Sequence, residues 1–415
     1  MAQNSWDKRL TLALDIGEQM AVSGAEVSRV EDSVSHILTA FGCLDSDVLS
    51  ITTSLIATVN IADYGSMTQT RRLATAAYDM NRLEKMNALS RAICDHRLDP
   101  DQARARYEEI IAEKPYSFLC QMLFYMGIAF SFALFFGGTP RDALLSTLIA
   151  ILFKFIDEFG KRYLLNRFLL VLLSSLLGGF LAILAVRAGL ADSVSKISIG
   201  DVMILIPGVI LTNSVRDMFG GDTITGGTHV AEASLVAIMI ALGFVTSSAA
   251  GDRLFVDELL NVGRSWSVFT NVIIGLLTAF LGSIAYAGSF NVKKRQLLFV
   301  GLGGLLAWCV YVLLGFVIAS EPLKYLLSAV AVNIYAERMA VVKRVPATVF
   351  IVGAIMPLVP GSGLYETMAL LISRQWGKFA SKGLETVSIA LALGFGILIA
   401  SSIFKSLKLA KSKRR

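Results

Sequence analysis

Two proline–glycine pairs, Pro207-Gly208 and Pro360-Gly361, lie within long apolar stretches of the chain. Proline removes a backbone donor and clashes with the preceding helical turn, and glycine adds conformational freedom. Backbone groups exposed at membrane depth are tolerated only where protein or a water-filled cavity covers them. We therefore expect two broken helices that meet at a central site, with a pair of simple packing kinks as the alternative.

Polar side chains within or beside the apolar stretches are the second group that could carry chemistry. A charge at the centre of a membrane helix costs roughly 2.5–3.5 kcal/mol on insertion scales, so these side chains should face a protein interior or a cavity. They are Asp201, Asn213, Arg216, Asp217, Asp222, His229, Glu232, Asn333, Glu337, Glu366 and Glu385. For those near the ends of the apolar stretches, a solvated charge at the membrane surface is the alternative.

The two halves of the chain repeat these features in the same order. Glu232 follows the first proline at the same offset at which Glu385 follows the second. Around them, "LIPGVILTN" parallels "LVPGSGLYE", and "AEASLVAIMIALGF" parallels "LETVSIALALGF". The matched positions favour Glu232 and Glu385 as carboxylates that exchange protons near neutral pH in a low dielectric.

Composition indicates which elements must hold these residues. Hydrophobic residues make up 55% of the chain and charged residues 17%, against about 25% charge in a typical soluble domain. Ten apolar stretches approach the roughly 20 residues that a helix needs to cross a bilayer. They cover approximately residues 116–137, 141–158, 164–187, 197–215, 229–249, 267–288, 296–318, 322–342, 347–366 and 384–404.

The predicted fold class is therefore an α-helical polytopic membrane protein with about ten transmembrane helices. The parallel segments divide these helices into five plus five. An odd number of spans in each copy forces the second copy to cross the bilayer upside down. Such an inverted repeat is the usual architecture of secondary transporters.

The first 115 residues carry regular charges and differ from the rest of the chain. The pattern predicts two helices within 6–41, β-strands within 48–62 and around 67–73, and helices at 79–96 and 100–114. No signal peptide begins this α/β domain, so we expect it in the cytoplasm. The predicted division is a cytoplasmic α/β domain (1–115), a first membrane repeat (116–265), a second membrane repeat (266–405) and a basic cytoplasmic tail (406–415).

Lysine and arginine predict the orientation in the membrane. With the N-terminus inside, most basic residues fall in loops on the inner face: Lys161, Arg162, Arg167, Arg216, Lys293, Lys294, Arg295, Lys343 and Arg344. One loop, with Arg374, Lys378 and Lys382, falls outside against this rule. The basic tail binds anionic lipid headgroups. We expect the inner (cytoplasmic) cell membrane as the location, with both termini cytoplasmic.

Several function classes are disfavoured by the same inspection. The glycine-rich loop after Arg216 lacks the GKS/T ending of a phosphate-binding loop, which argues against an ATP-driven pump. Four scattered cysteines and three histidines argue against disulfides and metal sites. Neither a GxSxG motif nor a serine or cysteine with an evident base is present, so we predict no enzyme activity and no cofactor. The basic tail lacks the aromatic or folded module that nucleic-acid binding would need.

Three segments carry a resemblance to a known family. They are "SGAEVSRVEDSVSHILTAFG" with "NRLEKMNALSRAI", "IPGVILTNSVRDMFGGDTITGG" and "PATVFIVGAIMPLVPGSGLYETM". In this order they resemble the N-terminal segment, the first-half signature and the second-component signature of the threonine/serine exporter family in its fused form. The resemblance implies efflux driven by the proton motive force. It carries over positions of the two signatures without assigning a role to any of them: Asn213, Arg216, Asp217 and Glu232 in the first, and Pro360, Gly361 and Tyr365 in the second.

Taken together, the sequence predicts a pathway for substrate and protons. Its residues are Pro207, Gly208, Asn213, Arg216, Asp217, Asp222, Glu232, Pro360, Gly361, Tyr365, Glu366 and Glu385. The predicted function is secondary active export of threonine or serine, with protons and membrane lipid as the other partners. The sequence leaves open whether the protein forms a homo-oligomer.

Two alternatives remain at this point. The first is export of a dicarboxylate, because some two-chain pairs of the family are associated with succinate. A dianion needs a fixed cation, for which Arg216 is the main candidate, whereas a zwitterion can use a carboxylate and half-helix N-termini. The second alternative is a channel or membrane scaffold with a sensory N-terminal domain.

Overall fold

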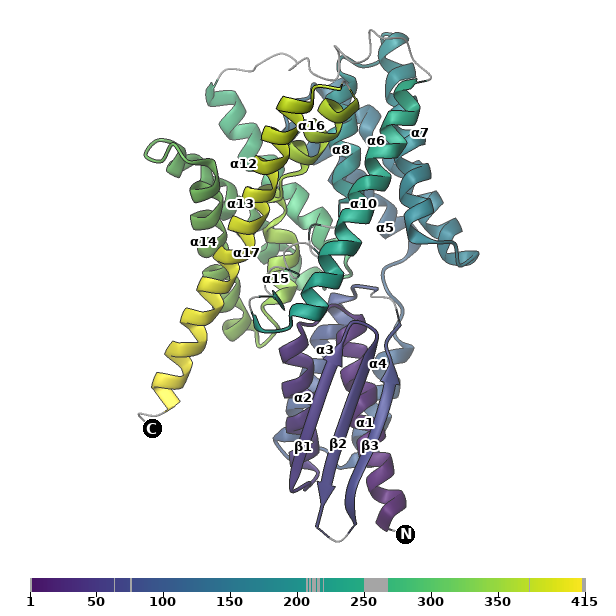
Figure 1. Ribbon diagram of the computed structural model, residues 1–415, viewed down its shortest axis with the longest axis vertical. Coiled ribbons are helices and arrows are strands. Elements are labelled where there is room, and N and C mark those ends of the chain that lie inside the picture. The colour runs from purple at the N-terminus through teal and green to yellow at the C-terminus, as the bar shows by residue number, and fades with distance from the viewer. Residues whose placement is uncertain are drawn as a thin grey trace.

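The computed structural model describes residues 2–412, apart from 63, 75–76, 207, 209, 211–213, 215–216, 219, 250–267 and 373. Its N-terminal part consists of seven elements in chain order: α1 (Ala2–Val22), α2 (Val27–Ala40), β1 (Asp45–Ile51), β2 (Ser54–Ile61), β3 (Gly65–Arg72), α3 (Met80–Cys94) and α4 (Pro100–Ala112). Figure 1 shows the three strands as one sheet with the helices behind it.

The sheet is antiparallel in the order β1-β2-β3, with Val48 opposite Ala57 and Val59 opposite Met67. Alternate residues of β2 are buried against the helices, because successive side chains of a strand point to opposite faces. The core between sheet and helices contains Leu10, Leu14, Ile16, Val34, Ile37, Leu55, Ala57, Val59, Leu83 and Met86. Each fully buried valine, leucine, isoleucine or methionine side chain among them contributes roughly 1.5–3 kcal/mol to the stability of the fold.

The predicted elements of this domain are confirmed. The break at Ser23-Gly24 separates α1 from α2, and Gly24 adopts a φ of 98° that suits glycine. The β-branched run predicted within 48–62 forms two strands that are joined by a turn at residues 52–53. Pro100 lies in the first turn of α4, where Asp99 caps the helix.

Long helices make up the remainder of the described chain. They are α5 (Phe118–Phe135), α6 (Pro140–Arg162), α7 (Arg167–Arg187), α8 (Val194–Leu205), α10 (Thr223–Ala249), α12 (Val268–Ser289), α13 (Lys294–Gly315), α14 (Glu321–Lys343), α15 (Thr348–Ala354), the 3₁₀ turn η1 (Met356–Leu358), α16 (Gly361–Ile372) and α17 (Trp376–Ser412). Each element falls on one of the predicted apolar stretches or at its edge.

Among the described residues, seven of these helices are long and apolar enough to cross a membrane, or eight if the bent pair α15–α16 counts as one span. The chain is thus a mostly helical, polytopic membrane protein. The ten predicted spans include two further segments. One forms α6, which carries Lys154, Asp157 and Glu158, and the other begins as α8, which has 12 residues. For these two segments the crossing stays a prediction.

One segment predicted as a loop is helical in the structure. Lys378 and Lys382 do not lie in a loop, because α17 already begins at Trp376. Lys382 forms ion pairs with Glu366 and Glu385 at 3.0 and 3.2 Å. Its charge is therefore balanced locally, which removes part of the conflict with the distribution of basic loops.

The helices of the two halves follow each other at a nearly constant interval. Thr223 at the start of α10 and Trp376 at the start of α17 are 153 residues apart, and Val194 of α8 and Thr348 of α15 are 154 apart. The packing partners correspond as well: α7 packs on α10 as α14 packs on α17, and α5 packs on α6 as α12 packs on α13. In Figure 1, α10 rises away from the N-terminal domain, whereas α17 descends toward the end where that domain lies.

The N-terminal domain is joined to the membrane helices by polar contacts. Glu84 is buried and accepts hydrogen bonds from Lys293 at 2.9 Å and from Arg295 at 2.8 Å. Thr348 at the start of α15 donates to Glu26 at 3.0 Å. Since α13 and α15 both begin at these contacts, the domain lies against one end of the helix bundle.

Candidate functional site

The two helix breaks have the same local geometry. Ile206 after α8 has φ −62° and ψ 129°, and Val359 after η1 has φ −64° and ψ 128°. Each precedes a proline, and a residue in that position is driven from the helical into the extended region by the proline ring. Gly208 N–H then donates to the Ile206 carbonyl at 2.9 Å, and Gly361 N–H donates to the Val359 carbonyl at 2.7 Å.

The two breaks also pack directly against each other. A Cβ atom on Gly208 would lie 2.9 Å from Met356 Cε, and one on Gly361 would lie 2.3 Å from Met203 Sδ. The intervals from Met203 to Met356 and from Gly208 to Gly361 are equal. The two contacts are therefore equivalent in the numbering: Gly208 packs on Met356, and their counterparts Gly361 and Met203 pack on each other.

A cavity of about 170 Å³ lies beside the first break. It is lined by Tyr78, Tyr125, Ile128, Arg167, Ile204, Leu205, Ile206, Gly208, Ile210, Tyr286, Ser289 and Phe290. The Tyr286 hydroxyl donates to the Ile206 carbonyl at 3.2 Å, so this carbonyl at the break accepts a second hydrogen bond beside that from Gly208 N–H. The cavity thus combines an apolar lining with three phenols and one guanidinium.

Tyr78 reaches this cavity from the N-terminal domain. Its ring packs edge-on against Phe290 at a centroid distance of 5.7 Å. Burial raises the pKa of the Tyr78 phenol, and the charge of Glu232 raises it further. The phenol is therefore neutral at physiological pH and closes one side of the cavity as a hydrogen-bonding group.

Charged residues surround the start of α10, at the end of the bundle that faces the N-terminal domain. Arg167 donates to Glu232 at 2.8 Å, with both side chains partly exposed. His229 Nδ1 lies 3.7 Å from Asp217. Burial and the charge of Asp217 raise the pKa of Asp222, which lies just before the helix. The structure thus brings Asp217, Asp222 and Glu232 to this end.

A corresponding group lies at the start of α17. Lys382 binds Glu385 on its own helix and Glu366 on α16, and Tyr365 precedes Glu366 on the same helix. α16 lies at the end of the bundle farther from the N-terminal domain in Figure 1. Glu232 and Glu385 have matching positions in the sequence, but the structure places them in separate ion pairs at opposite ends.

A third polar group lies inside the bundle, on α8. Asp201 and Ser198 are fully buried, and Ser146 of α6 donates to Asp201 at 2.6 Å. The buried Tyr365 hydroxyl lies beside Ser198, although without the geometry of a hydrogen bond. Of these residues, the predicted pathway contains only Tyr365. The signal for Asp201 was available, since it interrupts the apolar run "ISIGDVMILI".

Three of the predicted site residues, Pro207, Asn213 and Arg216, lie outside the described residues. Pro360 and Gly361 lie at the second break. The sequence also missed Tyr78, Tyr286 and the pairing role of Arg167, because a cavity lined by residues from distant segments has no local signature. Within the described residues, no three histidine, cysteine, aspartate or glutamate side chains gather in a way that could hold a metal ion.

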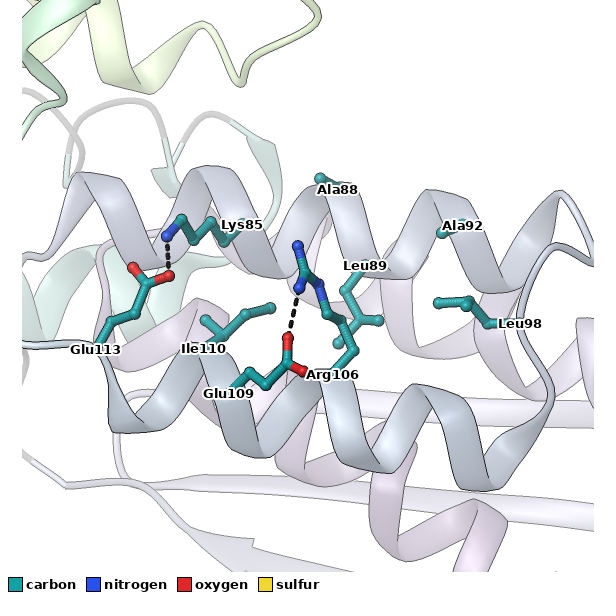
Figure 2. Close-up of a pocket in the computed structure, with 9 residues that line it drawn as sticks. All are labelled: Lys85, Ala88, Leu89, Ala92, Leu98, Arg106, Glu109, Ile110 and Glu113. Atoms are coloured by element: carbon teal, nitrogen blue, oxygen red, sulfur yellow. Dashed lines mark hydrogen bonds and ion pairs between the residues drawn. The ribbon is translucent and has the colours of Figure 1, made fainter.

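Another cavity, of about 250 Å³, lies between α3 and α4 in the N-terminal domain (Figure 2). Alanine and leucine side chains line it, and its charged groups pair with each other, Lys85 with Glu113 and Arg106 with Glu109. These ion pairs leave no free charge to select a polar solute. We therefore centre the candidate site on the helix breaks.

Comparisons with known proteins relate both halves of the chain to threonine/serine exporters. The sequence model of the threonine/serine exporter family matches residues 11–250, and a second model, described as "Threonine/Serine exporter, ThrE", matches residues 275–403. A "Probable threonine/serine exporter" of Mycobacterium tuberculosis is 24% identical over 97% of this chain and 77% of its own length. A "Threonine/serine exporter" of Corynebacterium glutamicum is 23% identical over 96% of this chain and 83% of its own length. No solved structure matches the chain.

Proposed function

Because this chain belongs to the threonine/serine exporter family, we propose that it exports threonine and serine across the cell membrane, driven by the proton motive force. The family consists of exporters, not enzymes. The observation that carries the proposal is the crossing of the two broken helices, in which Gly208 packs on Met356 and Gly361 on Met203. In secondary transporters, broken helices from two repeats bind the substrate near the middle of the membrane.

The ion pairs at the two ends of the bundle act as gates in this proposal. Arg167–Glu232, with Asp217 and Asp222 nearby, closes the end that faces the N-terminal domain. Lys382 with Glu366 and Glu385 closes the other end. In an inverted repeat, the two halves exchange conformations, so that one gate opens while the other closes. The equal spacing of the helices and the opposite ends of the matched glutamates support this arrangement.

A small zwitterion suits the cavity beside the first break better than a dianion. Arg167 is a cation that lines this cavity, and it is already paired with Glu232 at 2.8 Å. Three phenols and the Ser289 hydroxyl complete the polar lining, and the phenols can hydrogen-bond the hydroxyl, ammonium or carboxylate of serine or threonine. A dicarboxylate would require Arg167 to leave Glu232, and the partly buried Glu232 carboxylate would then lack a cation.

The proposed topology has ten spans, with the N-terminal domain and the basic tail in the cytoplasm and the tail on anionic lipid. It can be tested with single cysteines in a variant that lacks Cys43, Cys94, Cys120 and Cys309. Val317 is 85% exposed between α13 and α14, and Leu44 is 69% exposed in the N-terminal domain. An impermeant thiol reagent added to intact cells should label Val317→Cys but not Leu44→Cys.

Permeabilised cells provide the control for this experiment, because both cysteines should then react. Labelling of Leu44→Cys from outside at the rate of Val317→Cys would place the N-terminal domain outside the cell. That result would contradict the proposed orientation, although it would leave the family assignment intact.

Transport itself can be measured with inside-out membrane vesicles that receive labelled serine, threonine and succinate in parallel. With an acidic lumen, serine and threonine should accumulate with saturation, and collapsing the proton gradient should slow this accumulation. Uptake of succinate alone would overturn the amino-acid assignment. A measurable ion current without uptake of any of the three would instead indicate a channel.

A further inference from the structure

Asp201 is the most isolated charged group among the described residues of the helix bundle. Its side chain is 0% exposed, and α8 places it five residues before the break at Ile206. One carboxylate oxygen accepts a hydrogen bond from Ser146 at 2.6 Å. The other oxygen is buried and has no hydrogen-bond partner in the described part of the chain. An ionised carboxylate in such surroundings is strongly destabilised unless a proton or a cation joins it.

Among the described residues, no titratable group on the helices that pack against α8 is paired with Asp201. On α6, Asp142 accepts from the Asp192 and Ser193 backbone, and Lys154 binds Gln121, Asp157 and Glu158. On α7 and α10, Arg167 pairs with Glu232, and His229 approaches Asp217. On α16, Glu366 pairs with Lys382, and Tyr365 lies beside Ser198; on α5, Tyr125 lines the cavity. On α8 itself, Lys196 interacts with Glu366 and Asp142.

The position of Asp201 connects it to the moving parts of the bundle. α8 ends at the break that crosses the second break, and it packs on α5, α6, α7, α10 and α16. A Cβ atom on the neighbouring Gly200 would lie 2.8 Å from Ser146 Oγ and 3.0 Å from the Ala129 carbonyl. The helices are thus in close contact around Asp201, and any rearrangement of α8 changes the access of this carboxylate to water.

We infer that Asp201 binds the proton that drives export, with Ser146 positioning its carboxylate. This inference rests on the proposed function and names the coupling group within it. A proton enters from the outer side and forms an O–H bond on the free oxygen of Asp201. After α8 rearranges, the same bond breaks and the proton leaves to the cytoplasm, while the amino acid moves in the opposite direction. Na⁺ fits less well, since it needs several oxygen ligands, whereas Ser146 is the one hydroxyl that hydrogen-bonds to Asp201 among the described residues.

This inference assigns a different task to the two glutamates that the repeat singled out. Glu232 and Glu385 each hold an ion pair, and both reach solvent. Such groups can open and close with the ends of the bundle. Asp201, by contrast, is sealed from solvent in this conformation and has no charged partner among the described residues, so that a proton can neutralise it until α8 rearranges.

The test uses the purified full-length protein in proteoliposomes and two measurements. The first is exchange of labelled serine for unlabelled serine without any gradient, which needs no net proton movement. The second is accumulation of labelled serine driven by a proton gradient. In Asp201→Asn, the rate of serine exchange should stay within about threefold of the wild type. Accumulation of serine driven by the proton gradient should fall at least about tenfold. Asp201→Glu, which restores a titratable group, should recover part of it.

Ser146→Ala provides a milder variant that tests the same site. The Ser146 hydroxyl stabilises the charged Asp201 carboxylate. Its loss should therefore shift the pH midpoint of driven uptake toward higher pH by about half a unit to one unit. Ser175→Ala is the matched control, because this buried serine on α7 donates only to backbone carbonyls. It should not shift the midpoint.

Several results would overturn the inference. They are normal driven accumulation in Asp201→Asn, loss of exchange together with accumulation in a folded Asp201→Asn protein, and a wild type driven by Na⁺ but not by protons. If Asp201→Asn does not fold, an unshifted pH midpoint of driven uptake in Ser146→Ala contradicts the inference. A wild type that exchanges serine but ignores every gradient would instead contradict the proton-driven part of the proposed function.

Discussion

Replacing Gly361 by valine should reduce export of serine and threonine at least about tenfold, while the protein remains in the membrane. At this position a Cβ atom would lie 2.3 Å from Met203 Sδ and 3.2 Å from Ile206 Cδ1. A flexible methionine end can yield to one methyl group, but the branched valine also meets Ile206. Overpacking of this kind typically costs 1–3 kcal/mol, and 1.4 kcal/mol corresponds to a tenfold change in an equilibrium.

Gly208→Val should have a similar effect, because a Cβ atom there would meet Met356 and Val359. Gly315→Val is the matched control, since a Cβ atom at the end of α13 meets nothing within 4 Å. Initial rates of labelled serine uptake into vesicles, normalised to the amount of protein, provide the measurement. Unchanged rates in both Gly208→Val and Gly361→Val would mean that the crossing of the breaks is not part of the transport site.

The second large effect concerns stability rather than transport. Gly243→Ala and Gly396→Ala should each lower the free energy of unfolding by about 1–3 kcal/mol. A Cβ atom on Gly243 would lie 2.8 Å from the Leu176 backbone nitrogen, and one on Gly396 would lie 2.6 Å from the Leu326 carbonyl oxygen. The obstacles are backbone atoms of α7 and α14, which cannot move without separating the helices. Small residues permit this close approach between membrane helices.

The same helices contain suitable control positions for this experiment. Gly227 on α10 and Gly377 on α17 have nothing within 4 Å of an added Cβ atom. Alanine there should leave the protein unchanged or stabilise it by up to about 1 kcal/mol, because glycine is a poor helix former. Thermal denaturation of the detergent-solubilised protein compares the four variants. Equal melting temperatures for all four would show that α7–α10 and α14–α17 are not held by close glycine contacts.

These glycines follow the interval at which the two parallel segments of the sequence are spaced. Gly243 and Gly396 are separated by the same interval as Pro207 and Pro360, and both lie at the contact between the last helix of a half and its partner. The extended conformations of Ile206 and Val359 were likewise predictable, since each depends on the proline that follows directly in the chain. Helix positions, the two breaks and the α/β domain follow from local spacing of this kind.

Partners from distant segments could not be predicted in this way. Arg167 and Glu232 lie 65 residues apart, and Asn291 and Asp79, which join the bundle to the N-terminal domain, lie 212 apart. Matched positions suggested one shared task for Glu232 and Glu385, but the structure places them at opposite ends of the bundle with different partners. Asp201 is one polar residue among eleven in the sequence, and its sealed environment becomes visible only when α5, α6 and α16 surround it.

The amino-acid sequence alone thus determines the class of the protein, its family and the places where its helices break, and it predicts a repeat in its membrane part. All of these depend on hydropathy, on proline and glycine sterics, or on residues compared at a constant interval. Folding in three dimensions establishes which breaks touch, which charges are neutralised and which carboxylate is isolated from water. The physical reason is that electrostatic and packing energies depend on distances through space, whereas backbone conformation depends mainly on the nearest neighbours along the chain.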